Sequence, residues 1–149
     1  MFNTDTGGLG SLQPQREWDE FESLSSSTAK PPANDFAFIH VVHRRWAWPF
    51  EAKVLDTPGT LADYVKDIRE KFETGIAAPL IGEAGMIGYL LSGSPASFFT
   101  NLESRLGKPL ESVAEFENRA HRATRHSRDR TPPLRLHHMI MDCSSGTQA

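Results

Sequence analysis

The chain has 149 residues, of which 38% are hydrophobic and 23% charged, with a formal net charge of −3 at pH 7. This composition indicates one globular domain with polar segments, and it excludes a strongly basic protein. No window approaches the roughly 18 consecutive apolar residues that a membrane span needs, so we expect no membrane attachment. The single cysteine excludes an internal disulfide and the N-terminus lacks a secretory pattern, so we expect a cytoplasmic protein.

Residues 1–34 have the composition of a disordered arm, because glycine, serine, threonine and proline dominate and acids outnumber bases. Within this acidic, serine-rich arm, Trp18, Phe21 and Leu24 recur at every third residue. A two-turn helix would place the three side chains on adjoining parts of one face, which is how short disordered segments dock into a partner's groove. The alternative is that the segment packs back on its own domain.

Residues 36–56 predict a β-hairpin. The stretch up to Val42 is apolar on both faces, as in a strand covered on both sides, and residues 50–56 alternate again as its return strand. The two strands are separated by a group of cations and aromatic rings, namely Arg44, Arg45, Trp46 and Trp48. This group is a candidate binding surface, and the alternative is that its rings cap the core.

Helical signals dominate the middle of the chain. Residues 60–75 combine a capping threonine with apolar side chains at helical spacing, and residues 95–106 lie between a Ser-Pro start and a glycine stop. We also predict a short buried helix over residues 83–92 and a third long helix over residues 109–126. Residues 134–141 form a second strand candidate.

These elements together predict an α+β fold, in which a small antiparallel sheet packs against three or four helices. Residues 35–142 are expected to form this single domain, with the strand at 134–141 pairing with residues 36–44. The arm of residues 1–34 precedes it, and residues 143–149 are expected to form a frayed tail.

No spacing in the sequence matches a metal, nucleotide or nucleophile motif, so we predict no cofactor, no metal site and no catalytic residue. A metal-dependent enzyme remains a distant alternative, because pairing of the two predicted strands would bring histidines together. The histidines concerned are His40 or His43 from one strand and His137 or His138 from the other.

The leading functional hypothesis is therefore a non-enzymatic interaction or regulatory protein that binds a protein partner. Its predicted partner-binding residues are Trp18, Phe21, Leu24, Arg44, Arg45, Trp46 and Trp48. The alternative is nucleic-acid binding by the Arg/Trp group, because arginines interleaved with aromatic rings suit phosphates and stacked bases. It adds a stripe at every third residue of the third helix, made of Arg119, Arg122, Arg125 and Arg128. Neither the partner nor the oligomeric state follows from the sequence.

Overall fold

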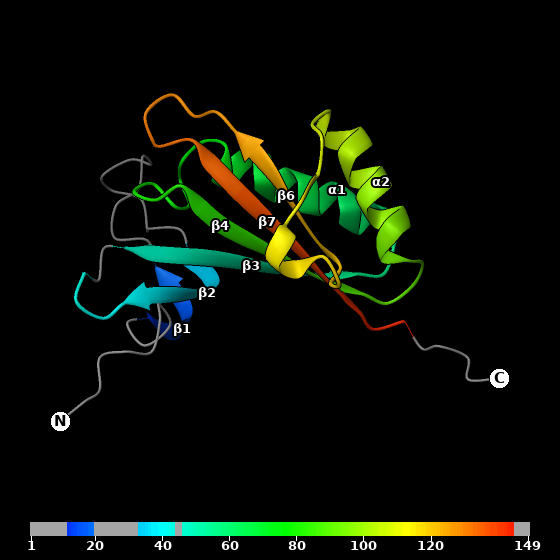
Figure 1. The fold of residues 1–149 in the computed structure, drawn as a ribbon, viewed down its shortest axis with the longest axis horizontal. Coiled ribbons are helices and arrows are strands. Elements are labelled where there is room, and N and C mark those ends of the chain that lie inside the picture. Colours follow the sequence, from blue (N-terminus) through cyan, green and yellow to red (C-terminus); the bar gives the residue numbers. More distant parts are fainter. Residues whose placement is uncertain (1–11, 20–32, 44–45, 145–149) are drawn as a thin grey trace.

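A seven-stranded mixed sheet forms the centre of the molecule, with strand order β1-β2-β3-β4-β7-β6-β5 (Figure 1). The structure is a computed structural model, and it describes residues 12–19, 33–43 and 46–144. The seven strands are β1 (Leu12–Asp19), β2 (Ala33–His40), β3 (Ala47–Leu55), β4 (Glu83–Leu90), β5 (Glu111–Ser112), β6 (His121–His126) and β7 (Leu134–Asp142). The first three pair as an antiparallel meander, β3, β4 and β7 are parallel neighbours, and β6 and β5 complete the far edge in antiparallel pairing.

Two helices cover one face of this sheet. The first, α1 (Pro58–Asp67), continues into a π-helical turn (Ile68–Phe72), and the second is α2 (Pro95–Leu106). Their buried side chains join those of β3, β4 and β7 in one hydrophobic core, in which Tyr64, Phe72 and Leu102 are fully buried. Both helices therefore lie on the same side of the central parallel strands (Figure 1).

Several predicted elements are confirmed. The hairpin is the β2–β3 pair, the helix predicted over residues 60–75 is α1 with its π-helical turn, and the strand at 134–141 is β7. The helix at 95–106 ends as predicted, because Gly107 adopts a left-handed conformation with φ of 64°. Its start is capped by Ser94, whose Oγ accepts a hydrogen bond from the Ser97 amide at 3.2 Å.

The predicted α+β fold with a small antiparallel sheet on three or four helices is wrong. The helix predicted over residues 83–92 is instead the central parallel strand β4 (Glu83–Leu90), in which residues 84–88 are buried on both faces of the sheet. Its glycines are required by close packing: a Cβ at Gly85 would lie 2.2 Å from the Phe50 ring, and one at Gly88 would lie 2.5 Å from Leu55.

The third predicted helix is also wrong. Residues 109–126 form β5, a 3-10 turn (Ala114–Phe116) and β6. The arginines recur at every third residue, which suggests a helix, but the side chains of a strand alternate with a period of two. Arg122, Thr124 and His126 therefore share the helix-covered face of β6. The predicted pairing of 134–141 with 36–44 is wrong as well, because β3 and β4 lie between β2 and β7.

The N-terminal region differs from the predicted arm. Residues 12–19 pair with β2 as an antiparallel edge strand, so Trp18 lies in a strand and packs on the small cluster of Ala37, Ile39 and Ala47. Phe21 and Leu24 lie outside the described residues.

Candidate functional site

Five charged side chains meet between β2, β3 and the end of α1. This carboxylate–lysine cluster consists of Asp35, Glu51, Lys53, Asp67 and Lys71. The antiparallel register that pairs Phe36 with Phe50 places Asp35 opposite Glu51, and the Ala52 amide donates to Asp35 Oδ2 at 2.7 Å. Lys53 lies two residues after Glu51 and therefore on the same face of β3.

Two close ion pairs link the strand residues of the cluster to the helical segment. Lys53 Nζ lies 2.7 Å from Asp67 Oδ2, and Lys71 Nζ lies 3.0 Å from Glu51 Oε2. Lys71 is also 3.6 Å from Asp67. Three carboxylates thus share two ammonium groups, which leaves the fully ionised cluster with one excess negative charge.

Glu51 is the unusual member of the cluster. It is only 3% exposed, and its Oε1 atom is buried with no hydrogen-bond partner among the described residues. Burial raises the pKa of Glu51 above its ordinary value, although the neighbouring Lys71 acts in the opposite direction. A buried carboxylate oxygen without a partner is costly, so its retention calls for a reason beyond folding.

Lys53 is held in its charged form. Burial acts to lower its pKa, but the hydrogen bond to Asp67 and the charges of Asp67, Glu51 and Asp35 outweigh this, so the pKa of Lys53 is raised. Lys53 therefore acts as a fixed cation, unsuited to the role of a general base near neutral pH.

A groove borders the Lys53–Asp67 end of the cluster, and neither Asp35 nor Glu51 lines it. Between β3 and the outer side of α1 lies a hollow of about 350 Å³, lined by Lys53, Asp67 and Lys66 among others. Its walls are mostly charged, which suits a polar ligand more than an apolar one.

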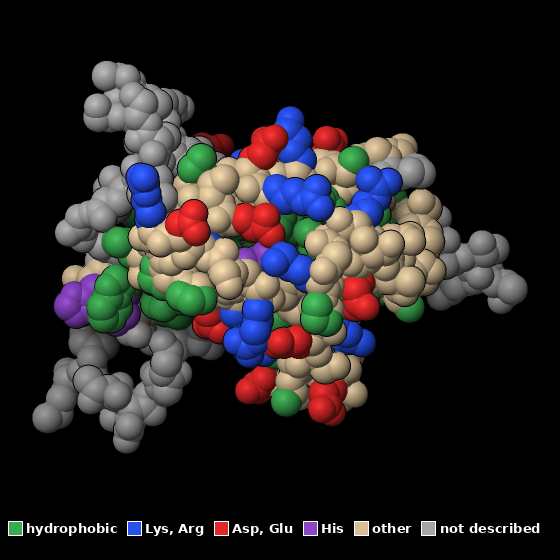
Figure 2. Space-filling view, turned by 90° about the horizontal axis from the view of Figure 1, so that it is seen from above, with side chains coloured by type: hydrophobic (Ala, Val, Ile, Leu, Met, Phe, Trp, Pro, Cys, Tyr) green, Lys and Arg blue, Asp and Glu red, His purple; other side chains and the backbone are tan. Residues whose placement is uncertain are grey.

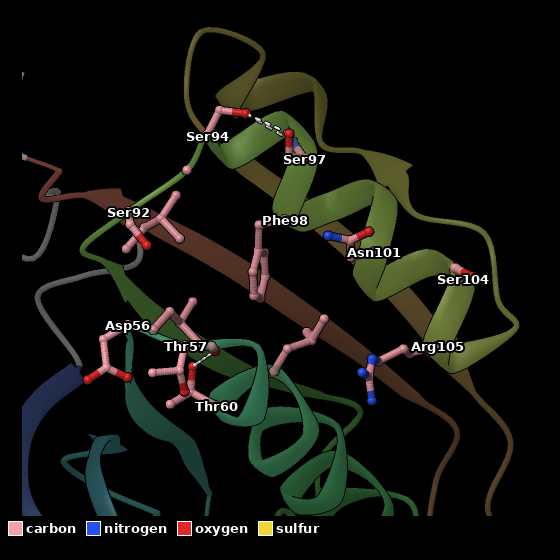
Figure 3. A pocket seen from close by; sticks show the side chains of 14 residues that line it. Asp56, Thr57, Thr60, Ser92, Ser94, Ser97, Phe98, Asn101, Ser104 and Arg105 are labelled. Carbon is pink, nitrogen blue, oxygen red and sulfur yellow. Dashed lines mark hydrogen bonds between the residues drawn. The ribbon is translucent and has the colours of Figure 1, made fainter.

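A larger pocket of about 460 Å³ lies at the carboxyl ends of β3 and β4, between α1 and α2 (Figure 3). Some of its hydroxyl groups bond within the protein: Thr60 donates to the Thr57 carbonyl at 2.6 Å, and Ser94 donates to Ser97 at 3.0 Å while capping α2. Among the described residues that line it, Asp56 is the only acid. This pocket therefore holds no paired acid–base groups, and the carboxylate–lysine cluster is the stronger candidate.

The predicted Arg/Trp group is only partly described. Trp46 is 49% exposed, and its ring centroid lies 5.7 Å from that of His40 and 4.8 Å from that of His43. Figure 2 shows histidine and hydrophobic side chains gathered at this end of the molecule, whereas Lys, Arg, Asp and Glu are interspersed elsewhere. Trp48 is half-buried in β3, and residues 44–45 lie outside the described residues.

The predicted arginine stripe does not form one surface. The Arg122 guanidinium lies over the Phe99 ring at 5.4 Å, and Arg125 pairs with Glu111 at 2.9 Å on the opposite face. Arg128 is 9% exposed and donates to four backbone carbonyls, among them those of Pro132 and Ile81. Arg128 is thus committed to holding loops together, and a binding role for Arg119, Arg122 and Arg125 stays a prediction.

The strand histidines are not brought together as the metal alternative requires. His137 bonds His121 at 2.8 Å and His138 bonds Tyr64 at 2.9 Å, both far across the sheet from β2. Within the part of the chain that the structure describes, no three His, Cys, Asp or Glu side chains are grouped closely enough to enclose a metal ion by themselves.

The sequence analysis missed Asp35, Glu51 and Lys53 as candidate site residues. A signal was present, since Glu51-Ala52-Lys53 alternates within a predicted return strand and so places a carboxylate and an ammonium on one face. Folding the predicted hairpin about its turn would then have brought Asp35 beside Glu51.

Comparisons of the chain with protein-family models, curated proteins and solved structures gave no match. Among the helices of the described residues, none combines the length and apolar character needed to cross a membrane.

Proposed function

We propose that the protein is a divalent-cation-dependent phosphodiester hydrolase that acts on nucleic acid. In this proposal Asp35 and Glu51 hold the cation, and Lys53 stabilises negative charge on the phosphate. The observation that carries the proposal is the buried Glu51 Oε1, which lacks a partner among the described residues, in a cluster with excess negative charge.

The donor set favours a hard cation such as Mg²⁺ or Mn²⁺. The cluster offers carboxylate oxygens without a thiolate or imidazole, and such ligands suit Mg²⁺ and Mn²⁺ rather than Zn²⁺. Mg²⁺ keeps several waters and is commonly bound by one or two carboxylates together with substrate phosphates. A site with two protein carboxylates therefore fits this ion even though the described residues contain no larger ligand group.

The chemistry follows from the charges. A bound divalent cation supplies Lewis-acid polarisation of the phosphate and favours ionisation of the attacking water. Lys53, fixed as an ammonium by Asp67, lies on the same face of β3 as Glu51 and stabilises the charge that develops on the phosphoryl oxygens. One water is consumed: its oxygen bonds to phosphorus, the bridging P–O bond breaks, and the leaving oxygen takes up a proton.

Nucleic acid is the substrate class that the rest of the hairpin supports. The same β2–β3 pair that carries Asp35 and Glu51 ends in an exposed Trp46 beside two histidine rings, and exposed aromatic rings are stacking platforms for bases. Residues 44–45 are both arginine, which adds two cations in the sequence at this turn.

A non-enzymatic interaction role is the second candidate. The observation that favours it is the exposure of three apolar side chains at the same turn: Val41 at 49%, Val42 at 74% and Trp46 at 49%. Exposed apolar groups of this kind also occur at protein–protein contacts. A partner that binds equally well to the wild type and to a Glu51→Gln variant would support this candidate.

The test is cleavage of end-labelled single- and double-stranded DNA and RNA oligonucleotides in the presence of Mg²⁺, Mn²⁺ or EDTA. We expect cation-dependent cleavage that falls by at least about 100-fold in Glu51→Gln, Asp35→Asn and Lys53→Met, the usual loss when a group that stabilises the transition state is removed. The control is Glu117→Gln, which changes an exposed carboxylate near β6 and should leave cleavage intact. No cleavage of any substrate, or cleavage unaffected by Glu51→Gln, would overturn the proposal.

A further inference from the structure

A continuous chain of hydrogen bonds runs through the core from α1 to the end of the π-helical turn. Tyr64 Oη bonds His138 Nδ1 at 2.9 Å, and His138 Nε2 bonds Thr124 Oγ1 at 2.9 Å. Thr124 Oγ1 also bonds His126 Nε2 at 2.7 Å, and His126 Nδ1 bonds Glu73 Oε1 at 2.8 Å. We call these five residues the His–Thr chain.

Near neutral pH, the donors and acceptors of the His–Thr chain can be assigned in only one consistent way. A carboxylate only accepts, so His126 donates from Nδ1 to Glu73, and its neutral Nε2 must accept the Thr124 hydroxyl proton. The Thr124 oxygen then accepts from His138 Nε2–H, which leaves His138 Nδ1 to accept from Tyr64. Burial keeps both imidazoles neutral, since it lowers the pKa of His126 and brings that of His138 down to about 3.

The two ends of the His–Thr chain hold the two ends of one helical segment. Tyr64 lies in α1 and Glu73 directly follows the π-helical turn, so the segment between them is fixed to β6 and β7 at both ends. A second anchor is Arg128, whose guanidinium donates to the Phe72 carbonyl at 3.4 Å.

That segment carries the helical half of the carboxylate–lysine cluster. Asp67 and Lys71 lie between the two anchors and reach β3, where they pair with Lys53 and Glu51. π-helical turns are rare and are often found at functional sites, because they displace side chains from regular helical positions.

We propose that Thr124, His126 and His138 are positioning residues, which hold the π-helical turn so that Asp67 and Lys71 pair with Lys53 and Glu51 at the cation site between β2 and β3. The part that concerns cation binding rests on the proposed function, whereas the part that concerns the placement of the turn stands on the geometry alone. None of the three residues touches the cluster, so each acts only through the segment that it fixes.

The first test determines, in the wild-type protein, which histidine nitrogens of the His–Thr chain carry a proton. Long-range ¹H–¹⁵N spectra at pH 7 should show His126 protonated at Nδ1 and His138 protonated at Nε2, which are opposite tautomers in two neighbouring rings. The same tautomer in both rings, or a doubly protonated ring at pH 7, would overturn the proposal without any variant having to fold.

The second test separates positioning from general stabilisation. Thr124→Val removes the hydroxyl at constant shape, and Glu73→Ala removes the last, partly exposed acceptor, whereas Thr124→Ser restores the hydroxyl. We expect amide exchange of residues 68–73 to rise at least tenfold more than that of α2 in the first two variants and to return toward the wild type in Thr124→Ser. Glu70→Ala, an exposed acid in the same turn, is the matched control and should leave exchange unchanged.

Mn²⁺ affinity measured on the same proteins completes the test. We expect affinity to fall about tenfold in Thr124→Val and to recover in Thr124→Ser. Equal increases in exchange in the turn and in α2 would overturn the positioning role, because they would show a purely global effect. If the wild type binds no Mn²⁺, the proposed function fails, while the tautomers and the exchange pattern still decide whether the turn is positioned as proposed.

Discussion

Two groups of polar side chains lie on the helix-covered face of the sheet, and they differ in how completely they are satisfied. In the His–Thr chain four hydrogen bonds join five residues, and each of these bonds has one donor and one acceptor. In the carboxylate–lysine cluster the charges do not balance, and Glu51 Oε1 has no partner among the described residues.

The difference separates polar groups that serve the fold from polar groups that the fold tolerates. A fully satisfied buried network specifies one arrangement of the elements that it joins. A buried carboxylate with a missing partner costs stability, and such costs are typical of sites kept for activity. The predictions below test this contrast.

The largest expected effect concerns acid stability and His138. Because the pKa of His138 falls from 6.5 to about 3 on folding, the unfolded state takes up this proton first as the pH decreases. The contribution of neutral His138 is thus fully present above pH 6.5 and is lost progressively down to about pH 3, by several kcal/mol. Urea unfolding of the wild type and of His138→Gln between pH 7 and pH 4 measures this, and the variant should show the flatter pH dependence. Parallel curves for the two proteins would contradict this assignment.

The next effect concerns the hydroxyl at the centre of the His–Thr chain. Thr124→Val leaves two buried imidazole nitrogens without partners, so we expect a loss of about 2–3 kcal/mol in the free energy of unfolding. Thr124→Ser keeps both bonds and should lose less than about 1 kcal/mol. Urea denaturation at pH 7 provides both values, and similar losses in the two variants would show that packing, not hydrogen bonding, stabilises this position.

Glu51→Gln should increase the free energy of unfolding, whereas Thr124→Val decreases it. The raised pKa means that the folded state favours protonated Glu51, so the ionised form present at higher pH is the one that the fold disfavours. A neutral glutamine removes this cost, and we expect roughly 1 kcal/mol of added stability at pH 7, the usual size of a stabilising substitution. The gain should shrink as the pH falls toward 4. Thermal unfolding at several pH values measures it, and a clear loss of stability at pH 7 would identify the Glu51–Lys71 pair as structural instead.

The smallest expected effect concerns the ammonium nearest to Glu51. Lys71→Met removes the ammonium that lies 3.0 Å from Glu51 Oε2 and that acts to lower the pKa of Glu51, so the variant favours the protonated carboxyl. We expect Mn²⁺ affinity to fall several-fold, in the same direction as in Thr124→Val. Lys108→Met, a cation near the end of α2, is the control and should not change the affinity.

The fold was predictable where the residues within one element are sufficient to specify its secondary structure. The apolar spacing after Thr60 predicts α1, but the predicted cap at Thr60 is wrong, because the helix begins at Pro58 and its N-cap residue is Thr57. Ser94 and Gly107 define the ends of α2, because caps are local signals. The strand at Glu83–Leu90 was not predictable in this way, since a strand buried on both faces lacks the alternation that distinguishes it from a buried helix. Its glycines are explained only by the neighbours Phe50 and Leu55, which the sequence places more than 30 residues away.

The site was predictable only in part. Alternation in β3 places Glu51 and Lys53 on one face, and the hairpin brings Asp35 next to them, so three of the five cluster residues could be predicted from the sequence. The contribution of Asp67 and Lys71 was not, because it depends on a π-helical turn and on anchors in β6. The arginines spaced by three in residues 119–128 were misleading, since three equal steps on a strand alternate between its two faces.

The central claim is that Asp35 and Glu51 form a divalent-cation site, and Mn²⁺ titration followed by electron paramagnetic resonance tests it most directly. The account predicts one bound Mn²⁺ per wild-type chain at pH 8, displaced by excess Mg²⁺, and loss of this site in Glu51→Gln but not in Glu117→Gln. A folded wild-type protein that binds no Mn²⁺, or binding that survives Glu51→Gln unchanged, would contradict it.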